Sequence, residues 1–154
     1  MAEHRTIRIR SAAPGDADTI AAFNRAVALE SEGKTLDASV LAAGVRAALS
    51  DADRCAYLLA EVAGAVAGQL MLTYEWSDWR NGWFWWIQSV YVDPSFRRRG
   101  VFRALYEHVG ALARARDDVR GVRLYVHEEN ARAIETYRAL GMSLSPYRVC
   151  EEAW

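Results

Sequence analysis

The segment SVYVDPSFRRRGVFRALY, residues 89–106, constrains the fold more than any other part of the chain. Alternating β-branched and aromatic residues stop at a proline, and three arginines and a glycine follow. An apolar pattern of helical period then begins. The segment therefore predicts a strand, a positively charged turn and a helix in direct succession.

The rest of the chain carries strand and helix patterns in an order typical of an α/β protein. Period-two and β-branched runs predict strands at residues 6–10, 55–62, 65–74, 83–92 and 122–126, with final strands within 143–154. Helical spacing and capping residues predict helices from residue 14, from about residue 36, from residue 100 and over 130–140. The order βααβββαβαβ, with one further β strand at most, indicates an α/β fold with a mixed sheet in a single domain over residues 1–154.

The composition restricts the classes of partner. The 154-residue chain has a formal net charge of −1, which argues against a basic protein that coats nucleic acid. No apolar run reaches the roughly 20 residues that span a bilayer, and the N-terminus lacks the pattern of a signal peptide. Cys55 and Cys150 lie far apart without metal-ligand spacing. We expect a cytoplasmic protein without a metal ion, a nucleic-acid partner or a membrane partner.

The positively charged turn lies where a helix exposes unpaired backbone N–H groups and the positive end of its dipole. Gly100 lacks a Cβ, so a ligand's oxygen atoms can approach the backbone closely. Four arginines add cations nearby: Arg97, Arg98, Arg99 and Arg103. These features predict an anion site, and the alternative is a solvated arginine loop.

A second pattern begins where the strand predicted at 122–126 ends. Asn130, Ala133 and Tyr137 are spaced by three and four residues and so share one face of a helix. An asparagine at a helix start is also a common cap, and a tyrosine at this spacing is commonly part of the core. The residues alone leave both interpretations open.

Together the two segments resemble a known family. The pattern V-x-P-x-x-R-x-x-G, which ends at Gly100, resembles the acyl-CoA-binding motif of the GCN5-related N-acetyltransferase (GNAT) family. The pattern N-x-x-A-x-x-x-Y-x-x-x-G-M, which begins at Asn130, is similar to that family's downstream motif. The resemblance covers nearly the whole chain. It implies a mostly antiparallel sheet with helices on both faces, and acetyl-CoA as the acyl donor.

The resemblance also implies roles for individual residues. Tyr137 would donate a proton as coenzyme A leaves, and the N–H groups from Arg98 to Arg103 would hold the diphosphate. Phe102 stands where the family usually has a small residue, and Arg98 replaces a frequent glycine. The residues implied to bind the cofactor are Val90, Tyr91, Val92, Arg97, Arg98, Arg99, Gly100, Val101, Phe102, Arg103, Asn130 and Ala133.

The acceptor is expected to be a primary amine, either a small cationic amine or a protein amine. Such an amine is almost wholly protonated at neutral pH, so a proton must be removed, yet the strand WFWWIQ holds no acid. The candidates for the base are Glu75, Asp78, His127, Glu128, or a water ordered by Gln88 or Ser89.

Aromatic side chains beside carboxylates attract ammonium groups. Two tryptophans share the segment EWSDWRNG with two acids, and the helix-connecting segment near residue 30 adds others. We therefore expect the acceptor to contact Glu30, Glu75, Trp76, Asp78, Trp79 and Gln88. The alternatives are core packing for the aromatic residues and polar-turn roles for the acids.

Two questions stay open at this level. A non-catalytic module that binds or senses acyl-CoA would share the cofactor motifs, and the missing strand acid keeps this alternative. Exposed aromatic residues could form the face of a homodimer.

Overall fold

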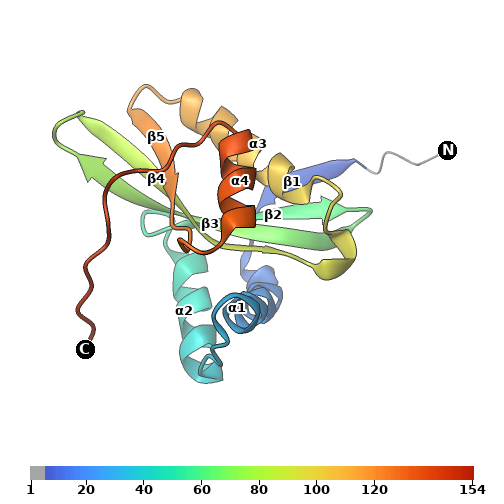
Figure 1. The fold of residues 1–154 in the computed structure, drawn as a ribbon. Helices are drawn as coiled ribbons and strands as arrows, with labels where there is room; N and C mark the ends of the chain where they lie inside the picture. Colours follow the sequence, from blue (N-terminus) through green and yellow to red (C-terminus); the bar gives the residue numbers. More distant parts are fainter. Residues whose placement is uncertain (1–5) are drawn as a thin grey trace.

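The computed structural model describes residues 6–154, which form a five-stranded sheet with helices on both faces (Figure 1). The strands are β1 (Ile7–Ser11), β2 (Ala56–Val62), β3 (Ala65–Ser77), β4 (Gly82–Val92) and β5 (Val119–Leu124). They lie in the order β1-β2-β3-β4-β5, and only β5 runs parallel to its neighbour. The predicted α/β class and the mostly antiparallel sheet are confirmed.

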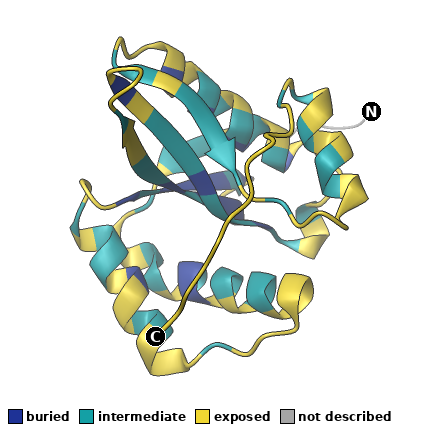
Figure 2. Ribbon diagram, turned by 60° about the vertical axis from the view of Figure 1, so that its left-hand side comes forward, coloured by how far each residue is buried: buried dark blue, intermediate teal, exposed yellow. Residues whose placement is uncertain are grey.

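Four α-helices cover the sheet: α1 (Ala17–Glu32), α2 (Ala38–Ser50), α3 (Val101–Arg114) and α4 (Ala131–Ala139). Helices α1 and α2 lie against one face, and α3 and α4 lie on the other, as Figures 1 and 2 show from two sides. Short 3₁₀ turns precede α1 (Pro14–Asp16) and α3 (Pro94–Phe96). The predicted helices are thus all present.

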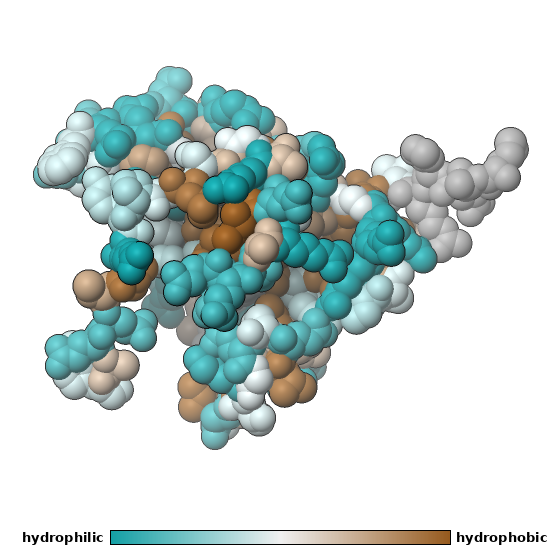
Figure 3. Space-filling model, in the orientation of Figure 1, coloured by the Kyte–Doolittle hydropathy of each residue, from teal (hydrophilic) through white to brown (hydrophobic). Residues whose placement is uncertain are grey.

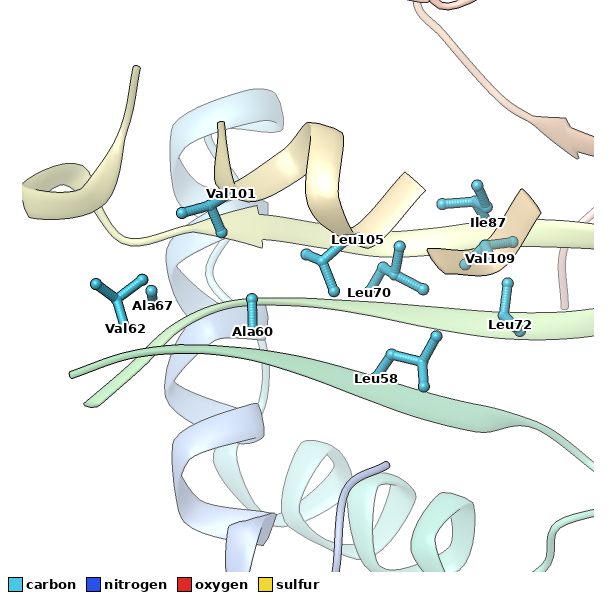
Figure 4. Packing of buried hydrophobic residues seen from close by; sticks show 10 residues of the cluster. All are labelled: Leu58, Ala60, Val62, Ala67, Leu70, Leu72, Ile87, Val101, Leu105 and Val109. Carbon is cyan, nitrogen blue, oxygen red and sulfur yellow. The ribbon is translucent and has the colours of Figure 1, made fainter. Parts of the chain in front are cut away.

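The apolar stripe of α3 forms the larger core (Figure 4). Val101, Leu105 and Val109 are buried against residues of β2, β3 and β4, among them Leu58 and Leu70. Truncation of a fully buried leucine to alanine costs about 2–5 kcal/mol, so this contact fixes α3 firmly on the sheet. The N-terminus of α3 is therefore held in place relative to the end of β4.

A second core lies on the opposite face of the sheet. Ile20 of α1 and Val45 of α2 pack on Tyr57 and Leu59 of β2. Helix α1 also crosses β4, where the rings of Phe23 and Tyr91 meet with their centroids 5.0 Å apart. Helix α1 therefore borders the second half of β4.

The start of α1 is tied to the edge of the sheet by Arg10. Its guanidinium group donates to Asp16 (2.8 and 2.9 Å) and to Glu61 (2.6 Å). The hydrogen bonds from Arg10 lower the pKa of Asp16 below its usual value. Asp16 also accepts from the N–H of Ala13 (2.7 Å), so one carboxylate connects β1, the 3₁₀ turn and α1.

Three boundaries differ from those predicted. Strand β3 continues to Ser77, so Glu75 and Trp76 belong to a strand instead of a loop. Strand β5 begins at Val119, because its parallel pairing with β4 starts opposite Trp83. The segment 143–154 forms no strand in the structure, and Pro146 lacks the N–H group that a ladder position requires.

Candidate active site

Strands β4 and β5 separate halfway along β4. Their pairing runs from Trp83 to Ile87 on β4 and ends at Leu124 on β5, whereas β4 continues to Val92 beside β3 alone. Among the described residues, the outer edge of β4 beyond Ile87 therefore has no strand partner. Such an edge offers backbone groups to an extended ligand, which can bind like an added strand. The predicted cofactor residues 90–92 lie on this open half.

A β-bulge at Ser89 marks the point of separation. Ser89 has a φ of +50°, and the register between β3 and β4 shifts between Gln69 and Met71. The side chain of Gln69 is wholly buried, and its Nε2 donates to the Ser89 carbonyl (3.2 Å) and to Oδ1 of Asn24 (2.8 Å). Bulges re-aim strands beside binding sites, and these two bonds connect this one to α1.

The N-terminus of α3 has no side-chain cap. Gly100 is the N-cap residue, with a φ of +81°, and its carbonyl accepts from the N–H of Ala104 (2.9 Å). The earlier N–H groups of α3 thus face the turn without an intrahelical partner. A pocket of about 480 Å³, here the helix-start pocket, lies between this N-terminus and α4 and is lined by Arg98, Arg103 and Arg132. Backbone donors and arginines together suit a diphosphate.

Arg98 and Arg99 of the turn lie in different surroundings. Arg99 lies over the ring of Phe96, at 5.7 Å from the ring centre. Arg98 lines the helix-start pocket with a φ of +64°, a left-handed conformation in which glycine is favoured.

Arg97 holds the end of β4 against α1. It donates to the carbonyl of Val92 (2.9 Å) and to Glu30 of α1 (2.7 Å), and the Tyr91 hydroxyl donates to the same carboxylate (3.1 Å). The Arg97 hydrogen bond lowers the pKa of Glu30. Glu30, a predicted acceptor contact, therefore accepts hydrogen bonds from two residues at the end of β4 and the turn that follows. Arg97 borders the helix-start pocket from the same position.

Tyr137 of α4 reaches the gap between the strands. The ring of Phe102 meets the Tyr137 ring edge to face, with centroids 5.8 Å apart. Phe102 also contacts Tyr106 (6.2 Å), so its ring packs between α3 and α4. Burial raises the pKa of the Tyr137 hydroxyl, which keeps it protonated at neutral pH. Val101, in contrast, points into the core.

Asn130 is the N-cap of α4. Its side-chain oxygen accepts from the N–H of Ala133 (3.1 Å), which satisfies one of the unpaired donors at the helix start. The two predicted residues therefore meet each other, and the cap fixes the helix that carries Tyr137. Their predicted contact with a cofactor stays a prediction.

A central pocket of about 510 Å³ lies between α1, the separated ends of β4 and β5, and α4. Gln88, Ser89 and Val90 line it from β4, and Tyr137 lines it from α4. The amide of Gln88 donates to Thr73 of β3, so its carbonyl oxygen remains for a ligand or a water. The pocket thus joins the bulge, the open edge of β4 and a protonated phenol.

Glu75 lies in a second, neighbouring pocket of about 400 Å³, here the side pocket. The Trp86 indole donates to Glu75 (2.6 Å), and Arg123 of β5 bonds to the same carboxylate (3.2 and 3.3 Å). The side pocket is bounded by β4, β5, α4 and the segment 142–149, and it shares Tyr137 with the central pocket. Figure 3 shows hydrophobic surface near the centre of this face, around α4.

The remaining predicted acceptor residues lie at the tip of the β3–β4 hairpin. Asp78 accepts from the N–H of Trp79, and the Trp79 side chain is 86% exposed. Trp76 pairs with Trp83 across the hairpin and is half exposed. The structure does not bring Trp76, Asp78 or Trp79 to the central or the side pocket.

Comparisons with known proteins match this geometry. The model of the acetyltransferase (GNAT) family matches residues 23–142. A crystal structure of a possible acetyltransferase from Clostridium difficile 630 is 46% identical, with a TM-score of 0.91 over 96% of this chain and 97% of that one. The chain belongs to the GNAT acetyltransferase family.

More distant structures share the fold of this acetyltransferase. A predicted acetyltransferase from Clostridium acetobutylicum, solved with acetyl-CoA, is 14% identical, with a TM-score of 0.75 over 96% of each chain. An aminoglycoside acetyltransferase from an uncultured soil metagenomic sample, in complex with sisomicin, is 14% identical, with a TM-score of 0.74 over 96% of this chain and 95% of that one. No curated protein matches the sequence.

The sequence analysis missed several residues that contact the bulge or line the pockets of this acetyltransferase. Gln69 stands alone as a polar residue in the apolar run AVAGQLML, and this isolation is the signal that could have marked it. Glu32, one of the acids near residue 30 that were expected beside the acceptor, lines the central pocket and pairs with Lys34 (2.6 Å). Arg123 of β5 and Tyr125, which follows the end of β5, line the side pocket, and no motif indicated them.

The candidates for the base of the acetyltransferase differ in position and in their contacts. Glu75 is paired with Arg123 and Trp86, and Asp78 lies at the hairpin tip. Nδ1 of His127 accepts from the N–H of Glu129 (3.2 Å), outside the central pocket. Gln88 lines the central pocket with a carbonyl oxygen that can order a water.

Two further findings concern the described part of the acetyltransferase. None of its helices in residues 6–154 is long and apolar enough to cross a membrane. The same residues contain no group of three or more histidines, cysteines or acids that could hold a metal ion.

Proposed function

We propose that the protein transfers the acetyl group of acetyl-CoA to a primary amine by direct attack in a ternary complex. The observation that supports this most is the central pocket, which joins the open edge of β4 to the protonated hydroxyl of Tyr137. An acceptor that enters this pocket meets the exposed strand edge and the phenol from one side.

The residues present fit the cofactor. The uncapped N-terminus of α3 and the arginines of the helix-start pocket provide donors for a diphosphate. Residues 90–92 provide strand backbone for an extended pantetheine arm. Several charge-assisted hydrogen bonds of about 1.5–3 kcal/mol each approach the roughly 8 kcal/mol of micromolar binding.

When bound, acetyl-CoA supplies the acetyl group as a thioester, whose C–S bond breaks as the C–N bond to the amine forms. Tyr137 holds its proton at Oη and gives it to the departing sulfur, after which solvent restores it; its raised pKa supports this role. Gln88 can order a water that takes the proton from the ammonium group. Ser89 at the bulge and Val90 after it line the same pocket.

Among the described residues, none that lines the central pocket is arranged as an activated nucleophile. Both described cysteines lie elsewhere, one buried beside α2 and the other in the C-terminal segment. This placement supports direct attack by the amine over an acyl-enzyme route.

The test combines binding with turnover. Calorimetry should find acetyl-CoA binding to the purified protein, and a panel of amines should release free coenzyme A thiol with an acetylated product of the expected mass. Binding without turnover across small amines, lysine peptides and protein N-termini would instead support a non-catalytic acyl-CoA-binding module. Absence of binding would overturn the proposal.

A further inference from the structure

The side pocket carries an excess of positive charge. Its lining holds three arginines, Arg123, Arg138 and Arg148, and one carboxylate, that of Glu75. The Glu75 carboxylate is already bonded to Arg123 and to the indole of Trp86. A cationic group that entered the pocket would find its only acid engaged and would face two further arginines.

Arg138 and Arg148 differ from Arg123 in their contacts. Arg123 is held by Glu75 and lies over the ring of Phe84, with its guanidinium carbon 3.7 Å from the ring centre. Within residues 6–154, neither Arg138 nor Arg148 forms an ion pair or a side-chain hydrogen bond. Two unpaired guanidinium groups at one pocket suit a carboxylate, which they can bind through paired N–H donors.

The floor of the side pocket is aromatic. The rings of Trp86 and Tyr125 are stacked, with centroids 4.5 Å apart, and the hydrogen bond to Glu75 fixes the indole. Ile134 and Leu144 add apolar lining. An apolar or aromatic group can therefore pack beside the arginines. The volume of about 400 Å³ fits a small molecule.

The central pocket has the opposite charge. Glu32 is its only described acid, it lies at the end of α1, and no arginine or lysine lines the pocket. Glu32 is paired with Lys34 at the surface, so its charge is partly screened. The two pockets share Leu124, Tyr125 and Tyr137, which makes one continuous surface from a weakly acidic end to a basic end.

The geometry points to an acceptor that carries both an amine and a carboxylate, the simplest being a free α-amino acid with an apolar or aromatic side chain. The amine lies in the central pocket, the carboxylate binds Arg138 and Arg148, and the side chain packs on Trp86 and Tyr125. The inference rests on the proposed function, because it names the acceptor of the same site. It replaces the cationic amine expected from the segment EWSDWRNG.

Matched pairs of acceptors isolate the carboxylate. L-phenylalanine and phenethylamine differ only in that group, as do L-leucine and isopentylamine, and spermidine represents cationic amines. Thiol release and product mass should show kcat/KM at least about tenfold higher for each amino acid than for its decarboxylated partner, since one charge-assisted contact contributes about that factor. Spermidine should be the poorest acceptor.

Variants of the two arginines locate the effect. Arg138→Gln and Arg148→Gln should each raise KM for L-phenylalanine about tenfold with little change in kcat, and leave phenethylamine unchanged. Both side chains are exposed, so the fold should tolerate the change, which thermal unfolding checks. Arg46→Gln, an exposed arginine of α2 outside both pockets, is the matched control.

The outcomes separate this inference from the proposed function. Equal acetylation within each pair, or an amino-acid preference that survives the double variant Arg138→Gln/Arg148→Gln, would overturn the inference and leave the acetyltransferase assignment standing. Transfer to peptides but not to free amino acids would do the same. If the protein binds acetyl-CoA but acetylates none of the amines, the proposed function is overturned, and the inference with it.

Discussion

Helices α3 and α4 both follow a strand and both border the gap between β4 and β5, yet they begin differently. Asn130 caps α4 with its own side chain, whereas α3 starts at Gly100 in a left-handed conformation without a side-chain cap. Helix α3 is buried through four residues of its stripe, and α4 has no fully buried residue. The difference supports the proposal that α3 offers its backbone N–H groups to the cofactor and that α4 positions the hydroxyl of Tyr137.

The largest effect should follow from removal of that hydroxyl. If α4 serves the chemistry, Tyr137→Phe should lower kcat by about 10²-fold or more, because a general acid contributes about 10²–10⁴-fold. The dissociation constant of acetyl-CoA, measured by calorimetry, should change less than about twofold. Tyr106→Phe on α3 is the control, since it makes the same chemical change beside Phe102. If Tyr137→Phe also lowers the affinity for acetyl-CoA, the proposed difference in role between α3 and α4 is wrong.

A change at the start of α3 should instead act on binding. Gly100→Ala places a Cβ at a φ of +81°, where left-handed backbone costs about 1–2 kcal/mol, although no atom lies within 4 Å of that Cβ. The shifted turn should weaken acetyl-CoA binding about tenfold, the value of one charge-assisted bond.

Gly64 offers a matched control for this strain. It has a φ of +82° in the β2–β3 turn, with similarly open surroundings. Gly64→Ala should lose a similar free energy of unfolding in urea and keep its affinity for acetyl-CoA. Equal affinities in the two variants would show that the start of α3 does not hold the cofactor.

The cap of α4 provides a smaller effect. Asn130→Ala removes the acceptor for the Ala133 N–H and should lower the free energy of unfolding by about 1 kcal/mol. Asn130→Asp keeps the acceptor and should retain most of the stability. If Asn130→Asp instead weakens acetyl-CoA binding several-fold, the side chain also contacts the cofactor, and the contrast between the two helix starts becomes weaker.

Relief of strain beside α3 should have a still smaller effect. Arg98→Gly allows the φ of +64° without a Cβ and should raise the free energy of unfolding by about 0.5–1 kcal/mol after the entropy of glycine is counted. The affinity for acetyl-CoA should fall less than about fivefold, because an exposed ion pair contributes at most about 1 kcal/mol. Urea unfolding and calorimetry measure the two changes separately. A loss of stability would mean that Arg98 makes contacts that outweigh its backbone strain.

The contribution of Tyr137 to the pH dependence of the rate should be the smallest effect of all. Burial raises the pKa of Tyr137 above 10.0, and a proton donor is active below its pKa. The rate should therefore rise as the amine deprotonates and should show no descending limb below about pH 10. The same shift contributes stability that is present below the unfolded pKa and is lost as the pH rises through the folded one. A descending limb near pH 8 in kcat would assign the acid to another group.

Local patterns predicted the parts that depend on neighbours in sequence. The apolar stripe that begins at Val101 predicted α3, and Gly100 predicted its start, because capping and helical period are properties of adjacent residues. The extension of β3 to Ser77 and the early start of β5 depend on pairing with β4, which no single segment encodes. The prediction of final strands within 143–154 was wrong, because Pro146 lacks the N–H group that a strand ladder requires.

The same distinction applies to the site. Tyr137 and the arginine turn were found through motifs, and both line pockets. The partners of Glu75 could not be predicted, because Arg123 lies 48 residues away and meets it only through parallel pairing of β5 with β4. Gln69 likewise acquires its role from a bulge on the neighbouring strand.

The position of β5 has a consequence for motion in the native state. It is paired with β4 on one side only, through five residue pairs, and among the described residues no strand covers its other edge. Amide hydrogen exchange should therefore be fast in β5 and slow in β2 and β3, where both edges are paired. Transient fraying of β5 would widen the gap between β4 and β5 that borders the central pocket, while the other strands stay paired.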